Sequence, residues 1–105
     1  MFIAIYRFQA KPGQVQSFIE AWKDLTELIY QHCGSLGSRL HREDELNFIA
    51  YAQWPDRDTW KHPKPLPATA DAIRQQMRES CSLIETLHEL EVERDLLQAQ
   101  VFETP

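Results

Sequence analysis

The chain has 105 residues, of which 43% are hydrophobic and 10% aromatic, and it carries a net charge of -5. This length suits one domain with one core, and the composition is that of a folded chain rather than a disordered or repetitive one. The acidic balance argues against nucleic acid or an anionic membrane as a partner.

The N-terminal third predicts a strand and then a long amphipathic helix. Phe2 to Phe8 is rich in Ile, Tyr and Phe, and the turn residues Lys11-Pro12-Gly13 close it. Apolar residues then recur at helical spacing from Val15 to Ile29, and glycine is expected to end this helix at Gly34. Trp22 lies on the apolar stripe, so we interpret it as core, although a pocket between helix and sheet would expose one edge of its ring.

Two strands and a short helical turn are expected in the middle of the chain. Ser38 to Arg42 and Leu46 to Trp54 have strand character and are joined by a charged turn. Pro55 cannot donate a ladder hydrogen bond, so the second of these strands ends before it. Asp56 can then cap a short helical turn that runs to Trp60. We therefore expect the two indoles, of Trp54 and Trp60, to meet.

The last third predicts an irregular connection, a second helix and a fourth strand. The stretch from His62 to Pro67 is too rich in proline for a regular helix and can line an opening. A helical stripe is expected from Ala70 through Met77 to Leu87, followed by a strand from His88 to Leu96. Residues 1–96 are thus the expected domain, and residues 97–105 the expected tail.

The predicted order of elements is strand, helix, strand, strand, helix, strand, which is the ferredoxin-like arrangement of an α+β fold. Its first and third strands lie centrally in a four-stranded antiparallel sheet, and both are apolar on both faces. Two helices cover one face, so the other face needs a further cover. We predict that a second copy provides it, giving a homodimer in which two sheets pack as an α+β barrel.

Three segments resemble a known family. They are KPGQVQSFIEAW after the first strand, GSLGSRLHR, and most specifically FIAYAQWPDRDTW with its Trp-Pro-x-x-x-x-Trp turn. Over roughly residues 1–96 the chain resembles the antibiotic biosynthesis monooxygenase domain family, which belongs to the dimeric α+β barrels. The resemblance implies a ferredoxin-like dimer and a small oxygenase that needs neither metal nor flavin.

Oxygenation without a cofactor makes chemical demands that several residues can meet. Triplet oxygen reacts slowly with closed-shell molecules, so the substrate must become an electron-rich phenolate or enolate inside a dry, aromatic-lined cavity. We expect His62 to act as base or hydrogen-bond donor, and Arg39 to stabilise an anionic oxygen. Tyr51 completes the expected catalytic set, and the expected substrate-binding residues are Trp54, Trp60, His41 and Trp22.

Each of these candidates also has a structural interpretation. Trp54 and Trp60 can form a clasp at the edge of the sheet, and His62 can be a surface residue before proline. Arg39 and His41 can belong to the dimer interface or to an exposed edge strand, and Tyr51 can hydrogen-bond across that interface.

Metal, haem and thiol chemistry receive less support from the sequence. The four histidines show no ligand spacing, so we predict no metal. Relatives that degrade haem use an asparagine in the first strand and a helical histidine; Tyr6 stands near the first position, and the expected second helix has no histidine before His88. We therefore expect no haem. Cys33 and Cys81 are expected to be buried, reduced thiols.

The leading hypothesis is a homodimeric, cofactor-independent monooxygenase that acts on a small aromatic or quinol-like compound. The alternative is a non-catalytic ligand-binding or regulatory module that keeps the barrel and pocket without turnover. The chain has no apolar run of the roughly 20 residues that a membrane span needs and no secretory leader pattern, so we expect a cytoplasmic protein.

Overall fold

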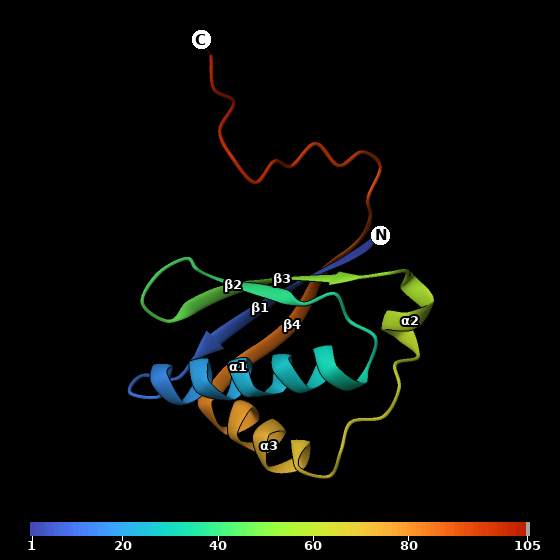
Figure 1. Ribbon diagram of the computed structural model, residues 1–105. Helices are drawn as coiled ribbons and strands as arrows, with labels where there is room; N and C mark the ends of the chain where they lie inside the picture. Colours follow the sequence, from blue (N-terminus) through green and yellow to red (C-terminus); the bar gives the residue numbers. More distant parts are fainter. Residues whose placement is uncertain (105) are drawn as a thin grey trace.

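The structure, a computed structural model, describes residues 1–104 as an antiparallel sheet with helices packed on one of its faces (Figure 1). The strand order β2-β3-β1-β4 and the order of elements along the chain are ferredoxin-like, as predicted. The elements are β1 (Phe2–Ala10), α1 (Val15–His32), β2 (Ser38–Arg42), β3 (Asn47–Trp54), α2 (Arg57–Lys61), α3 (Ala70–Ser80) and β4 (Cys81–Glu91).

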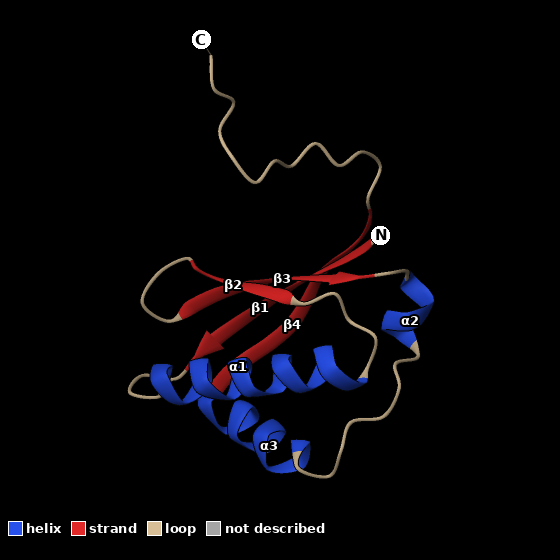
Figure 2. Cartoon of the chain, viewed as in Figure 1, coloured by secondary structure: helices blue, strands red, loops and turns tan. Residues whose placement is uncertain are grey.

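The sheet has two unlike faces. Helices α1 and α3 lie on one side of it, and the other side faces away from them (Figure 2). β1 and β3 are the central strands, paired so that Phe2 lies opposite Trp54 and Phe8 opposite Phe48. These four side chains are buried under the helices. The opposite face, called here the open face, carries the alternate residues of the same strands, including Ile3, Ile5, Ile49 and Tyr51.

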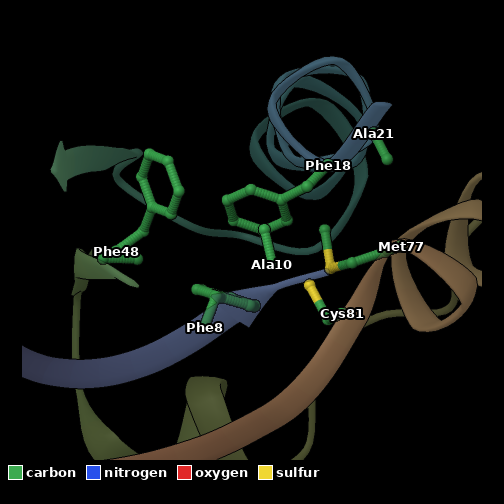
Figure 3. Packing of buried hydrophobic residues seen from close by; sticks show 8 residues of the cluster. Phe8, Ala10, Phe18, Ala21, Phe48, Met77 and Cys81 are labelled. Carbon is green, nitrogen blue, oxygen red and sulfur yellow. The ribbon is translucent and has the colours of Figure 1, made fainter. Parts of the chain in front are cut away.

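Helix α1 packs on the sheet through the apolar stripe that its sequence predicts. Phe18 is 0% exposed, and its ring centroid lies 5.1 Å from those of both Phe8 and Phe48. Figure 3 shows this cluster, with Met77 of α3 and Cys81 of β4 completing it. The helix ends at His32, and Gly34 has a φ of 83°, so the expected glycine stop is confirmed.

Helix α2 is short and is held by the predicted cap. The Asp56 carboxylate accepts hydrogen bonds from the backbone N–H and the hydroxyl of Thr59, each at 2.7 Å. These hydrogen bonds hold the pKa of Asp56 below its ordinary value. The cap fixes the direction in which α2 leaves β3, and thereby the position of Trp60.

The expected boundary between the second long helix and the last strand is wrong. Helix α3 ends at Ser80, and β4 runs from Cys81 to Glu91, so Ile84 and Leu87 lie in the strand and not on a helical stripe. Pairing with β1 decides the matter, because β4 satisfies the backbone of that central strand from Ala10 to Phe2. Tertiary pairing overrides the local helical spacing.

Residues 92–104, called here the C-terminal arm, follow β4 without helix or strand. The expected strand to Leu96 therefore stops at Glu91. The arm leaves the sheet on the side opposite α1 and α3 (Figure 1). Four of its apolar side chains are largely exposed: Leu96, Leu97, Val101 and Phe102. Within residues 1–104, no helix is both long and apolar enough to cross a membrane.

Candidate functional site

Two cavities between the helices and the sheet share part of their walls. The inner chamber has a volume of about 220 Å³ and lies between α1 and the central strands. The outer chamber, of about 270 Å³, lies beside α2 and the proline-rich connection. Tyr6, Ile29 and Trp54 line both chambers.

The inner chamber is mostly apolar. Phe8, Trp22 and Leu25 are among its walls, and Thr26, Ser35, Ser38 and Tyr6 are its lining residues that carry hydroxyl groups. Trp22 is half-buried and packs against the core while one side of it meets the chamber. The sequence-based expectation of a core residue with an exposed edge describes this arrangement. Such a lining suits a flat hydrophobic molecule.

Tyr6 supplies a hydroxyl group at the junction of the two chambers. The indole N–H of Trp60 donates a hydrogen bond to this hydroxyl at 2.6 Å. Burial raises the pKa of Tyr6, the Trp60 hydrogen bond partly offsets this, and the charge of Glu89 adds to it. The hydroxyl is therefore protonated at neutral pH. Because it accepts from Trp60, its own hydrogen is free to be donated to a ligand.

Tyr6→Phe is expected to remove a pH-dependent part of the stability. Because the pKa of Tyr6 is raised above 10.0 in the folded state, the unfolded chain loses this proton first as the pH rises. The wild-type free energy of unfolding should therefore fall as the pH rises from about 10.0 to the raised pKa of Tyr6 in the folded state. Urea unfolding at about pH 9 and about pH 11 should show a smaller fall for the variant. Equal falls in both proteins would contradict the assignment.

Trp54 carries a buried donor without a partner. The side chain is 6% exposed, and its indole N–H has no hydrogen-bond acceptor among residues 1–104. An unpaired buried donor costs about 1–3 kcal/mol, so such groups in folded proteins usually have a partner. Since the ring lines both chambers, a water molecule or an acceptor oxygen on a ligand can accept this hydrogen bond.

Trp60 completes the aromatic wall of the outer chamber. Its ring centroid lies 5.0 Å from that of Phe2, and it packs against the cluster that contains Trp54. The two tryptophans thus belong to one cluster, and the aromatic ring that pairs with Trp60 is that of Phe2, in a tilted arrangement. Sequence reasoning found these indoles but not Tyr6 as a site residue, because a tyrosine in an apolar strand is typical of a core.

The other sequence-based candidates do not line the two chambers. Arg39 and Tyr51 are paired on the open face, where the guanidinium carbon lies 5.7 Å from the centre of the Tyr51 ring. They line a shallow pocket of about 230 Å³ at that face. His41 is exposed, and its Nδ1 lies 3.1 Å from the Ile49 carbonyl oxygen. The three tryptophan candidates therefore line the chambers on the helix side of the sheet. Arg39, His41 and Tyr51 lie on the open face.

His62 lies at the end of α2 with an exposed side chain. Its backbone N–H donates to the Asp58 carbonyl at 2.8 Å, and the next residue, Pro63, lines the outer chamber. In the part of the chain that the structure describes, neither chamber is lined by a histidine or a carboxylate. Residues 1–104 also contain no group of three or more His, Cys, Asp or Glu side chains arranged to hold a metal ion.

The thiols do not form a disulfide. Cys33 and Cys81 are both free and buried, as predicted. Cys33 lines the outer chamber, and burial raises the pKa of its thiol while the charge of Arg74 partly opposes the rise. Burial likewise raises the pKa of Cys81, which packs in the core. Neither thiol is an activated nucleophile.

Comparison with known proteins gives one family and a consistent fold. The family described as antibiotic biosynthesis monooxygenase matches residues 1–79. No protein of curated function gave a match.

Among solved structures, SnoaB, a cofactor-independent oxygenase from Streptomyces nogalater, is similar with a TM-score of 0.70 at 14% identity, over 92% of this chain and 97% of that one. A putative antibiotic biosynthesis monooxygenase from Deinococcus radiodurans gives 0.72 at 10% identity, over 95% and 100%. One from Nitrosomonas europaea gives 0.70 at 15% identity, over 90% and 100%. At these identities the likeness shows the fold.

Proposed function

The chain belongs to the antibiotic biosynthesis monooxygenase family, and we propose that it is a cofactor-independent monooxygenase acting on a small aromatic or quinol-like compound. The observation that carries the proposal is the buried, unpaired indole N–H of Trp54, in a wall shared by two aromatic chambers with the Tyr6 hydroxyl. SnoaB, which has the same fold, is described as an oxygenase of this kind.

The substrate itself must supply the electrons for this reaction. When one atom of dioxygen enters the substrate and the other leaves as water, two electrons and two protons have to come from the substrate. A ring CH₂ beside a phenol satisfies this balance, because it becomes a C=O group while O₂ gives that oxygen and one molecule of water. The reaction starts when the phenol loses its proton and the ring becomes electron-rich.

Trp54 and Tyr6 are suited to hold the resulting oxyanion. Both are neutral donors in a buried setting, and such donors stabilise developing negative charge more strongly there than in water. The raised pKa of Tyr6 keeps its proton on the hydroxyl, so Tyr6 acts as a hydrogen-bond donor and not as the base. The mostly apolar lining of the inner chamber would limit the access of water to the electron-rich ring.

His62 is the proposed base. It is exposed at the end of α2, next to a residue that lines the outer chamber, so it can pass a proton to solvent. We propose secondary roles for Arg39, His41 and Tyr51 at the open face, where a second copy would bring them into an interface.

Trp54→Phe is expected to lower oxygen uptake by about tenfold to a hundredfold, because it keeps an aromatic ring and removes one donor to the oxyanion. The assay measures oxygen consumption by metal-stripped protein with a panel of hydroquinones and hydroxylated polycyclic aromatics. Trp22→Phe is the matched control, since its ring also lines the inner chamber. The control should retain most of the activity.

The same assay separates catalysis from mere binding. Saturable binding of the panel without oxygen uptake would favour the non-catalytic binding module and reject the oxygenase. If uptake occurs, His62→Ala should lower turnover more than it lowers stability. Equal relative losses of turnover and stability would show that His62 is not the base. The proposed roles of Trp54 and Tyr6 as hydrogen-bond donors would not be affected.

We also propose that the protein works as a homodimer joined through the open faces. Ile5 and Ile49 are half-buried apolar residues on the face of the central strands that no helix of residues 1–104 covers, whereas Ile3 on the same face is only 5% exposed and lies beside the C-terminal arm. A groove of about 500 Å³ lies between this face and the start of the C-terminal arm. Sheet-to-sheet packing of two copies would bury Ile5 and Ile49, with about 800 Å² per partner as a usual size.

A further inference from the structure

We propose that the outer chamber recognises a carboxylate on the ligand, and that Lys64 and Arg74 determine this specificity. The inference rests on the proposed function, because it assigns the substrate class of the same site. The ligand is then a flat aromatic acid whose apolar body occupies the inner chamber and whose acidic group faces outward.

The charges of the outer chamber support this assignment. Lys64 and Arg74 both line it, and they come from different elements, the proline-rich connection and α3. Neither has an ion-pair partner in the described part of the chain, and no carboxylate lines the chamber. In a chain with a net charge of -5, two unpaired cations at one cavity are a local reversal of the overall charge.

Three other cations of the chain have carboxylate partners. Arg7 lies 2.9 Å from Glu43, and Arg57 lies 2.6 Å from Glu89. Lys23 lies 3.0 Å from Glu27 on the same helix. No carboxylate of residues 1–104 lines the outer chamber, so the carboxylate of a bound ligand can pair with Lys64 and Arg74.

The order of polarity along the two chambers fits one kind of ligand. Apolar and aromatic walls lie innermost, the donors of Tyr6 and Trp54 lie at the shared wall, and the two cations lie at exposed positions. The charge of Arg74 also reaches the chamber wall, since it opposes the burial-raised pKa of the Cys33 thiol. A rigid ring system with an acceptor oxygen and a distal carboxylate would contact all three zones.

The test compares 2-naphthoate with its neutral counterpart 2-naphthamide by calorimetric titration of the full chain. Exposed ion pairs contribute modestly, so the wild type should bind the acid about fivefold to twentyfold more tightly than the amide. The double variant Lys64→Gln with Arg74→Gln should bring this ratio close to one without weakening the amide. High salt should also weaken the acid selectively.

Matched controls remove the same charge outside the chamber. Lys61→Gln lies at the end of α2, and Arg78→Gln lies one turn beyond Arg74 on α3; neither residue lines the cavity. Both should keep the wild-type ratio. Equal binding of the two probes by the wild type, or an unchanged ratio in the double variant, would overturn the carboxylate assignment alone. Failure of both probes to bind would overturn the chamber as a ligand site, and the proposed function with it.

Discussion

Phe18→Ala is expected to lower the free energy of unfolding by about 3–5 kcal/mol, which is a large part of the stability of a small domain. Phe18 is fully buried, and its ring contacts those of Phe8 and Phe48, so it joins α1 to both central strands. Its loss leaves a cavity that the surrounding sheet cannot close, because the backbone of β1 is paired on both sides. Urea unfolding followed by far-UV circular dichroism measures the change.

Tyr30→Ala is the matched control on the same helix. Tyr30 is 61% exposed, so its truncation should change the free energy of unfolding by less than about 0.5 kcal/mol. A loss of similar size in both variants would contradict the assignment of α1 to the core layer. If Phe18→Ala unfolds the chain outright, Phe18→Leu should still show a measurable, smaller loss.

The strand order and helix α1 were predictable because local pattern and tertiary structure agree in these segments. Alternation in β1 and β3, the long apolar stripe of α1 and the Asp56 cap each specify one conformation. The boundary between α3 and β4 was not predictable in the same way. There Ile84 and Leu87 fit a helical spacing as well as a strand, and pairing with β1 chooses the strand.

One part of the candidate site was likewise predictable from the local sequence, and another part was not. The indoles of Trp54 and Trp60 were predicted to lie together because the Pro55 and Asp56 turn returns the chain within a few residues. The contact between Tyr6 and Trp60 joins residues 54 positions apart, and no local pattern reports it. Period-two alternation does carry one usable signal: Tyr51 and Trp54 are an odd number of residues apart, so they face opposite sides of β3.

The cations of the outer chamber show a further limit of sequence reasoning. Lys64 lies in an irregular segment and Arg74 on an exposed helix position, so each by itself is an ordinary surface residue. Their relation to the aromatic wall appears once the connection after α2 is placed against α3. Convergence of polar groups on a cavity is a tertiary property, whereas composition and spacing describe each residue alone.

Ile5→Asp is expected to convert the proposed dimer into a monomer. Ile5 lies on β1 at the centre of the open face, between Tyr51 of β3 and His88 of β4. An unpaired charge buried in an interface costs about 3–5 kcal/mol, so the dissociation constant should rise by about a hundredfold or more. Aspartate is short and cannot extend its carboxylate to solvent, unlike lysine. Sedimentation at low micromolar concentration measures the shift.

Ala72→Asp adds the same charge on an exposed position of α3, in the helix layer and away from the open face, so it should sediment like the wild type. The pair of variants tests the burial of Ile5 rather than net charge, because both chains carry one more negative charge than the wild type. A wild-type chain that sediments as a compact monomer, or an Ile5→Asp chain that stays dimeric, would contradict the sheet-to-sheet interface. In the first case the apolar residues Ile5 and Ile49 of β1 and β3 would have to be stable in water, against the usual expectation that a two-layer α+β fold keeps one polar face.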